Sequence, residues 1–251
     1  MLFFQALLGI IIIQAIFGRI AIRFRTDKVT DLAYGGAFLL VVWWVYLTGS
    51  DQSLLHTCLV RLISFRSVRL AGYLFLRVIV LGKDKRFDGI REVRRSFIRF
   101  RILQAVCIFL VLLPTLFAMD ASQPSMARYG RIGVLVALGG FSLETIADRQ
   151  KFRFKQQYPT RRCDTGVWSI IRYPNYLWEM FFWIGIYMIC LSVLSGWQVI
   201  IWAISPFTIV RLLLFITGIP PLERQHELMR WKDPERQTYK KHTSRLIPYI
   251  Y

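Results

Sequence analysis

The chain has 251 residues, of which 55% are hydrophobic and 15% aromatic, and its mean hydropathy is +0.43. This composition is too apolar for an ordinary soluble domain, and several apolar runs approach the roughly 20 residues that a helix needs to cross a bilayer. The net charge of +18 belongs to no separate soluble segment, so it favours contact with a lipid bilayer over nucleic acid.

The apolar runs predict an all-α polytopic membrane protein with seven transmembrane helices, over residues 2–22, 32–47, 54–81, 102–119, 132–147, 176–194 and 199–216. Lys and Arg are concentrated after the first, third, fifth and seventh runs. This alternation predicts an N-terminus outside and a C-terminus in the cytoplasm. We expect one integral membrane domain over residues 1–251, with the cytoplasmic loop 148–175 and the cytoplasmic tail 218–251 as a cap on the cofactor side. The first run has no basic segment before it and no convincing cleavage site, so we expect a retained span.

The third run carries basic residues that a membrane helix would normally exclude. Arg66, Arg69, Tyr73 and Arg77 follow one another at spacings of three, four and four, which places them on one helix face. An Arg at the centre of a span costs about 2.5–3.5 kcal/mol on insertion scales. The shared polar face predicts a cavity that holds anionic groups, and the alternative is that Arg61 and Arg77 snorkel to the interfaces.

A second polar group stands at the entrance to the sixth run. Asn175 and Glu179 lie one turn apart there, and the preceding basic loop contains Lys155 and Arg172. A helix N-terminus attracts anions through its free N–H groups and its dipole, so this arrangement suits a phosphate-rich ligand. An ordinary loop of lipid-facing charges explains it equally well. No glycine-rich nucleotide motif and no Gly-x-Ser-x-Gly motif is present, and the cysteines and histidines are not spaced as a metal site.

Four segments together resemble a known family of membrane enzymes. They are GKDKRFDGIR (82–91), ETIADRQKFRFK (144–155), TGVWSIIRYPNYLWE (165–179) and LERQHELMRWKDPERQTYKKHTSRLIPYIY (222–251). In this order they resemble the steroid 5-alpha-reductase family, and in particular its bacterial membrane branch. In the third segment, Tyr173 takes the place of the family's His and Trp178 that of its Gly.

The resemblance implies a seven-helix bundle in the bacterial inner membrane that opens to the cytoplasm. It implies NADPH as cofactor and a lipophilic, steroid-like or isoprenoid substrate in which a carbon–carbon double bond next to a carbonyl is reduced. It assigns catalytic roles to Tyr73 and Glu179. The cofactor-binding residues that it implies are Arg69, Arg77, Arg86, Asp148, Lys155, Arg172, Asn175, Tyr176, Glu179 and Tyr239.

Two other functions remain open. The isoprenylcysteine carboxyl methyltransferases share the later helices and the Arg-containing loop but bind S-adenosylmethionine. The Asn-Tyr-x-x-Glu pattern of Asn175, Tyr176 and Glu179 favours the reductases over them. The second helix lacks the Glu that the steroid enzymes use on the substrate carbonyl, which fits a non-enzymatic lipid-binding scaffold. Oligomeric state is not indicated.

Overall fold

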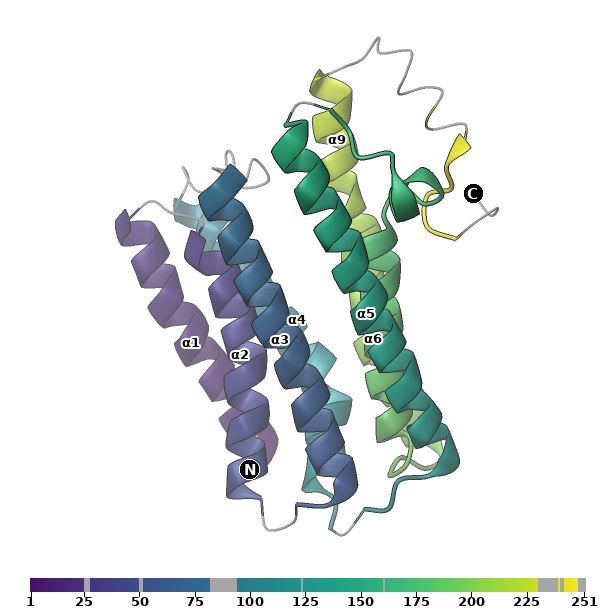
Figure 1. The fold of residues 1–251 in the computed structure, drawn as a ribbon. Helices are drawn as coiled ribbons and strands as arrows, with labels where there is room; N and C mark the ends of the chain where they lie inside the picture. The colour runs from purple at the N-terminus through teal and green to yellow at the C-terminus, as the bar shows by residue number, and fades with distance from the viewer. Residues whose placement is uncertain are drawn as a thin grey trace. The chain divides into compact units, whose positions relative to one another are not determined.

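The computed structural model describes residues 1–24, 28–49, 52–81, 94–122, 124–159, 161–229, 239 and 242–247. These residues are mostly helical, and within them the only β-type pairing is an isolated parallel bridge between Ile171 and Ser244. The elements are α1 (Leu2–Phe24), α2 (Lys28–Thr48), α3 (Leu54–Leu81), α4 (Arg94–Asp120), α5 (Arg128–Gln157), the 3₁₀-helix η2 (Gly166–Ser169), α6 (Pro174–Cys190), α7 (Trp197–Trp202), α8 (Ile204–Arg211), the π-helix η3 (Leu212–Ile216) and α9 (Ile219–Met229) (Figure 1). The expected all-α class is confirmed for the described residues.

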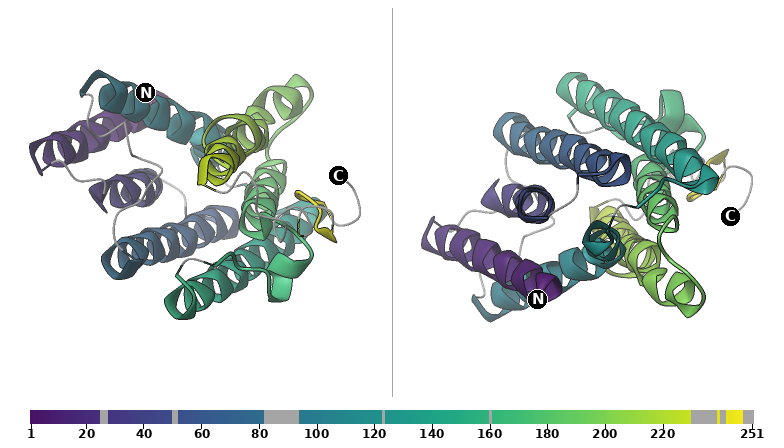
Figure 2. Two further views of the ribbon diagram at one scale, coloured as in Figure 1. Left: turned by 90° about the horizontal axis from the view of Figure 1, so that it is seen from above. Right: turned by 90° about the horizontal axis from the view of Figure 1, so that it is seen from below.

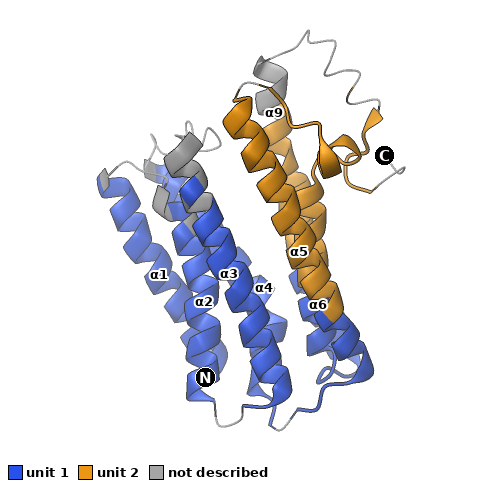
Figure 3. Cartoon of the chain, viewed as in Figure 1, with its two compact units in different colours: residues 1–134, 185–208 blue, residues 135–184, 209–251 orange. Residues whose placement is uncertain are grey.

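The chain forms two compact units, and the three boundaries between them fall inside α5, α6 and α8 (Figure 3). Unit 1 comprises Met1–Val134 and Gly185–Thr208, and unit 2 comprises Leu135–Ile184 and Ile209–Tyr251. The single integral domain over residues 1–251 stays a prediction.

In unit 1, α2 packs against α1, α3 and α4 (Figure 2). Its contact face is the row Ala33, Ala37, Val41 and Val45, each at most 3% exposed. Residues four apart lie on one face of a helix, and small side chains let neighbouring helices approach closely. Other apolar residues of α2, such as Trp44, remain exposed, as they do on a helix that faces lipid.

The helices α5 and α6 pack on each other through glycine. In unit 1, a Cβ on Gly133 would lie 2.7 Å from the carbonyl oxygen of Gly185. In unit 2, a Cβ on Gly140 would lie 2.6 Å from the backbone nitrogen of Phe182. Gly133, Gly140 and the fully buried Ala137 thus form a face of small residues on α5.

Four helical segments are long and apolar enough to cross a membrane, within the part of the chain that is described. They are Leu2–Arg23, Arg95–Asp120, Arg128–Gln157 and Trp197–Arg224, and Leu32–Thr48 is a shorter apolar helix. In length and composition these helices are typical of a membrane protein. Among the remaining helices, α3 carries several arginines, and α6 has 17 residues. The seven-span count and the orientation therefore stay predictions.

The first part of the predicted loop 148–175 is helical, because α5 continues without interruption to Gln157. The residues from 148 to 157 include Arg, Gln and Lys, which favour helix, and contain neither Gly nor Pro. The first proline comes at position 159, just beyond the helix end. The irregular part of the connection is thus shorter than the sequence suggested.

Candidate functional site

Two acidic residues are buried on α5, on or beside the face that Gly133, Ala137 and Gly140 form. Glu144 is 2% exposed and Asp148 is 6% exposed, and they lie one turn apart. Burying a carboxylate costs free energy unless it is paired or hydrogen-bonded, so acidic residues in an apolar helix mark a functional site by default. The indole Nε1 of Trp168 donates a hydrogen bond of 3.0 Å to the carbonyl oxygen of Ala147, next to Asp148 in the chain. The loop that contains η2 therefore covers this end of α5.

Trp168 also links the loop to the C-terminal tail. The hydroxyl of Tyr239 donates a hydrogen bond to the carbonyl oxygen of Trp168. The guanidinium of Arg162 lies 4.2 Å from the centre of the Tyr239 ring, and the ammonium of Lys151 lies 4.5 Å from the Trp168 ring. Burial raises the pKa of Tyr239, which keeps its hydroxyl protonated as a donor. Tyr239, a predicted cofactor contact, thus fastens the loop to the tail.

Lys155, the predicted phosphate contact, closes the turn after α5. Its Nζ donates to the carbonyl oxygens of Pro159 at 3.2 Å and of Arg161 at 2.5 Å. A cation at the C-terminal end of a helix satisfies carbonyl groups that lack partners there and interacts favourably with the helix dipole. Its role toward a phosphate stays a prediction.

The backbone just before α6 is bonded to the tail. The N–H of Arg172 donates to the carbonyl oxygen of Ser244 at 2.9 Å, and the N–H of Ser244 donates to the carbonyl oxygen of Ile170 at 3.1 Å. This short parallel bridge fixes where the side chains of Arg172 and of the tail stand.

An ionic cluster is centred on Glu223 of α9. The hydroxyl of Tyr173 donates to Glu223 Oε1 at 3.3 Å. The guanidinium groups of Arg172 and Arg245 lie 3.8 Å and 3.9 Å from the same carboxylate. Burial, and then the nearby Glu223 carboxylate, raise the pKa of Tyr173. Two guanidinium groups face one carboxylate, so the cluster carries a net positive charge.

The start of α6 bears three predicted cofactor contacts. Pro174 occupies the first helical position, where its missing N–H costs no hydrogen bond. Tyr176 is buried and stacks on Tyr173 with 5.9 Å between ring centres. Asn175 and Glu179 are half-buried, one turn apart. Two of the three side chains thus remain partly open at the surface of the unit.

The predicted site residues are divided between the two units. The half-buried Arg69 and Tyr73 are on α3, in unit 1, where the neighbouring Arg66 is 1% exposed. The side chain of Arg77 and the whole of Arg86 lie outside the described residues. The members that unit 2 contains are Asp148, Lys155, Arg172, Asn175, Tyr176, Glu179 and Tyr239.

Sequence reasoning missed two polar centres. It gave no role to Arg245 or to Glu223. It also began the fourth apolar run at residue 102 and so left out Arg101, which the structure buries in α4. Arg101 donates to Gln14 of α1 at 3.0 Å and to Thr30 of α2 at 3.2 Å. The available signal was Gln14, a polar residue in the middle of the first apolar run.

Comparison with known proteins identifies one family. No match to a curated protein was found. A family model matches residues 17–243, which is most of the chain. The chain therefore belongs to the family described as "Protein of unknown function (DUF1295)".

Proposed function

We propose that this protein is a membrane-embedded, NADPH-dependent reductase that saturates a carbon–carbon double bond next to a carbonyl in a lipophilic substrate. The observation that carries the proposal is the gathering of polar residues in unit 2. This unit combines the buried Glu144 and Asp148 with Arg172 and with the half-open Asn175 and Glu179. The resemblance of segments 144–155 and 165–179 to the steroid 5-alpha-reductases supports the same conclusion.

The residues of unit 2 fit a nucleotide with several phosphates. Arg172 is 8% exposed, and its Nε is a buried donor with no hydrogen-bond partner within the described part of the chain. It precedes the N-terminus of α6, where free N–H groups also favour an anion. Asn175 and Glu179 offer an amide and a carboxylate for the hydroxyl and carboxamide groups of a nicotinamide riboside.

NADPH, when bound, supplies a hydride to the β-carbon of the substrate. In the proposed reaction, Asn175 and Glu179 hold the nucleotide in position. A hydrogen-bond donor at the substrate carbonyl oxygen stabilises the negative charge that develops there. A proton then adds to the α-carbon, so that the double bond gains one hydride and one proton in total.

Isotope transfer tests the proposal directly. The purified protein, in nanodiscs, is incubated with a lipid extract and NADPH that carries deuterium at the transferable position. We expect a lipid product with one deuterium, and none from the Glu179→Ala variant. A methyl group transferred from labelled S-adenosylmethionine would contradict the proposal and indicate a methyltransferase. Absence of any product, together with absence of nucleotide binding, would instead favour a lipid-binding scaffold.

A further inference from the structure

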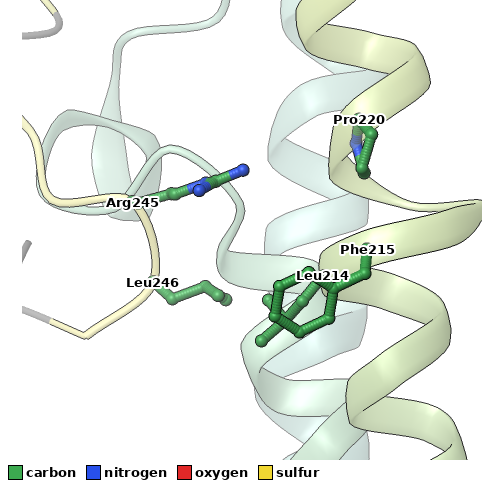
Figure 4. A pocket seen from close by; sticks show the side chains of 5 residues that line it. All are labelled: Leu214, Phe215, Pro220, Arg245 and Leu246. Atoms are coloured by element: carbon green, nitrogen blue, oxygen red, sulfur yellow. The ribbon is translucent and has the colours of Figure 1, made fainter.

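Unit 2 contains a pocket beside its C-terminal tail, and none of the residues that line it is assigned to the nucleotide. Its volume is about 360 Å³, and it is lined by Leu214, Phe215, Pro220, Arg245 and Leu246 (Figure 4). Four of the five side chains are apolar, and the fifth is a guanidinium. The lining comes from η3, α9 and the tail, three segments that meet in this unit.

Local helix geometry explains why space is left here. The segment η3 is a π-helix, a wide helical form that is rare and often occurs at functional sites. The N–H groups of Thr217 and Gly218 both bond to the carbonyl oxygen of Leu212, which ends the π-helix. The chain then enters α9, where Pro220 has no N–H to donate. Leu246 of the tail covers the break and forms one wall of the pocket.

The charged side of the pocket attracts an anion. Arg245 and Arg172 both face Glu223, at 3.9 Å and 3.8 Å, distances too long for hydrogen bonds. The Nε atoms of both arginines are buried and have no hydrogen-bond partner among the described residues. The cluster thus has a net positive charge and spare N–H donors, which an anionic group can use.

The position of the pocket along the chain indicates a lipid-like ligand. The candidate membrane span Trp197–Arg224 contains η3, and the pocket lies toward its C-terminal end. Charged headgroups lie at the ends of membrane spans, and acyl chains lie along their middle. Phe215 lines the pocket and is 71% exposed, so one apolar wall of the pocket reaches the surface of the helix.

We propose that this pocket binds an amphiphile with an anionic headgroup on an acyl chain. Arg245 receives the carboxylate or phosphate group, and Leu214, Phe215 and Leu246 contact the first part of the chain. A volume of about 360 Å³ is at the lower end for small-molecule sites, which suits a headgroup and a short apolar segment rather than a whole lipid. The proposal does not depend on NADPH binding.

The test is a titration of protein in phosphatidylcholine nanodiscs, whose lipid is zwitterionic and has no net negative charge. The probes are oleate, its uncharged methyl ester and inorganic phosphate, and a second set of discs contains phosphatidylglycerol. We expect oleate to bind, with the methyl ester at least tenfold weaker and phosphate alone weaker still. If phosphatidylglycerol replaces oleate with the same dependence on Arg245, the ligand is a bilayer phospholipid. Equal binding of oleate and its methyl ester, or full binding of phosphate alone, would overturn the proposal.

Two variants locate the site. Arg245→Gln is expected to weaken binding of the anionic probe at least tenfold. The matched control is Arg224→Gln, because Arg224 is exposed on α9 and does not line the pocket, and its affinity should change less than twofold. Arg245→Lys keeps the positive charge without the guanidinium group, so it should give an intermediate affinity. Binding by this variant would show that a change at position 245 does not by itself misfold the protein. Equal losses in the Arg245 and Arg224 variants would place the anion elsewhere.

Protein that binds oleate but not NADPH would keep this proposal and remove the proposed function.

Discussion

Single residues in unit 2 show how a buried charge is accommodated near the end of a membrane helix. Glu223 is only partly exposed and is surrounded by two guanidinium groups and the Tyr173 hydroxyl. Removing one partner of such a pair leaves the other charge uncompensated, which costs more than the pair itself contributes. Glu223 therefore holds α9 to the residue before α6 and to the tail, and its main role is positional.

The raised pKa of Tyr173 predicts a loss of stability at alkaline pH. Its pKa lies above the ordinary value of 10.0, so the folded chain binds this proton more tightly than the unfolded chain does. The stabilisation is complete below a pH of about 10 and is lost as pH rises further. We expect Tyr173→Phe to reduce this alkaline loss, as measured by thermal unfolding in mild detergent across the alkaline range. The exposed Tyr158→Phe serves as the control and should keep the wild-type profile.

Asn175 and Glu179 are expected to determine nucleotide affinity without supporting the fold. Both are half-buried, and neither belongs to the apolar core around Tyr173 and Tyr176. Asn175→Ala and Glu179→Ala should each lower NADPH affinity at least tenfold, which is about 1.4 kcal/mol. Far-UV circular dichroism should stay as in the wild type. Gln156→Ala, an exposed change on α5, is the control, and wild-type affinity in both site variants would remove these residues from the site.

Individual helices show which parts of the fold were predictable from the sequence. The spacing of the basic residues in the third run correctly placed them in one helix, and Arg66 is indeed buried. The extension of α5 to Gln157 was not expected, because a charged sequence gives no apolar signal even where it favours helix. The π-helix η3 was also unexpected, since Leu212–Ile216 is uniformly apolar and fits any buried or lipid-facing helix.

The glycine contact between α5 and α6 gives a prediction with an internal control. A Cβ on Gly140 would lie 2.6 Å from the backbone of α6, whereas a Cβ on the adjacent Gly139 would meet no atom within 4 Å. Gly140→Ala should therefore lower the thermal midpoint, through about 1–3 kcal/mol of overpacking. Gly139→Ala should raise it, through up to about 1 kcal/mol of helix propensity. Equal effects of the two substitutions would contradict the close packing.

At the scale of the whole molecule, sequence predicted the class of protein better than its site. Apolar runs and basic connections indicated a membrane protein, and four long apolar helices agree with that. The ionic cluster could not be predicted, because Arg172, Glu223 and Arg245 are far apart in the chain. The bridge between Ile171 and Ser244 and the packing of α9 on Tyr173 and Tyr176 bring them together. Such contacts depend on tertiary folding rather than on local pattern.

The alternation of basic segments predicts the membrane orientation. With the four native cysteines replaced by Ala, Ser122→Cys should react from outside intact cells with a membrane-impermeant maleimide. Ser169→Cys, in the loop that contains η2, should react only after the membrane is permeabilised. Both positions are exposed, so accessibility depends on the side of the membrane. The opposite labelling pattern would reverse the predicted topology.

The central claim is that the folded protein binds NADPH. The most direct measurement is a thermal-shift titration of the purified wild-type protein and its Asn175→Ala variant with NADPH, NADH and S-adenosylmethionine. A ligand that binds only the folded state stabilises it by about 2.7 kcal/mol at one hundred times its Kd. We predict that NADPH raises the thermal midpoint of the wild type and has little effect on the variant. Stabilisation by S-adenosylmethionine alone, or by none of the three ligands, would contradict the claim.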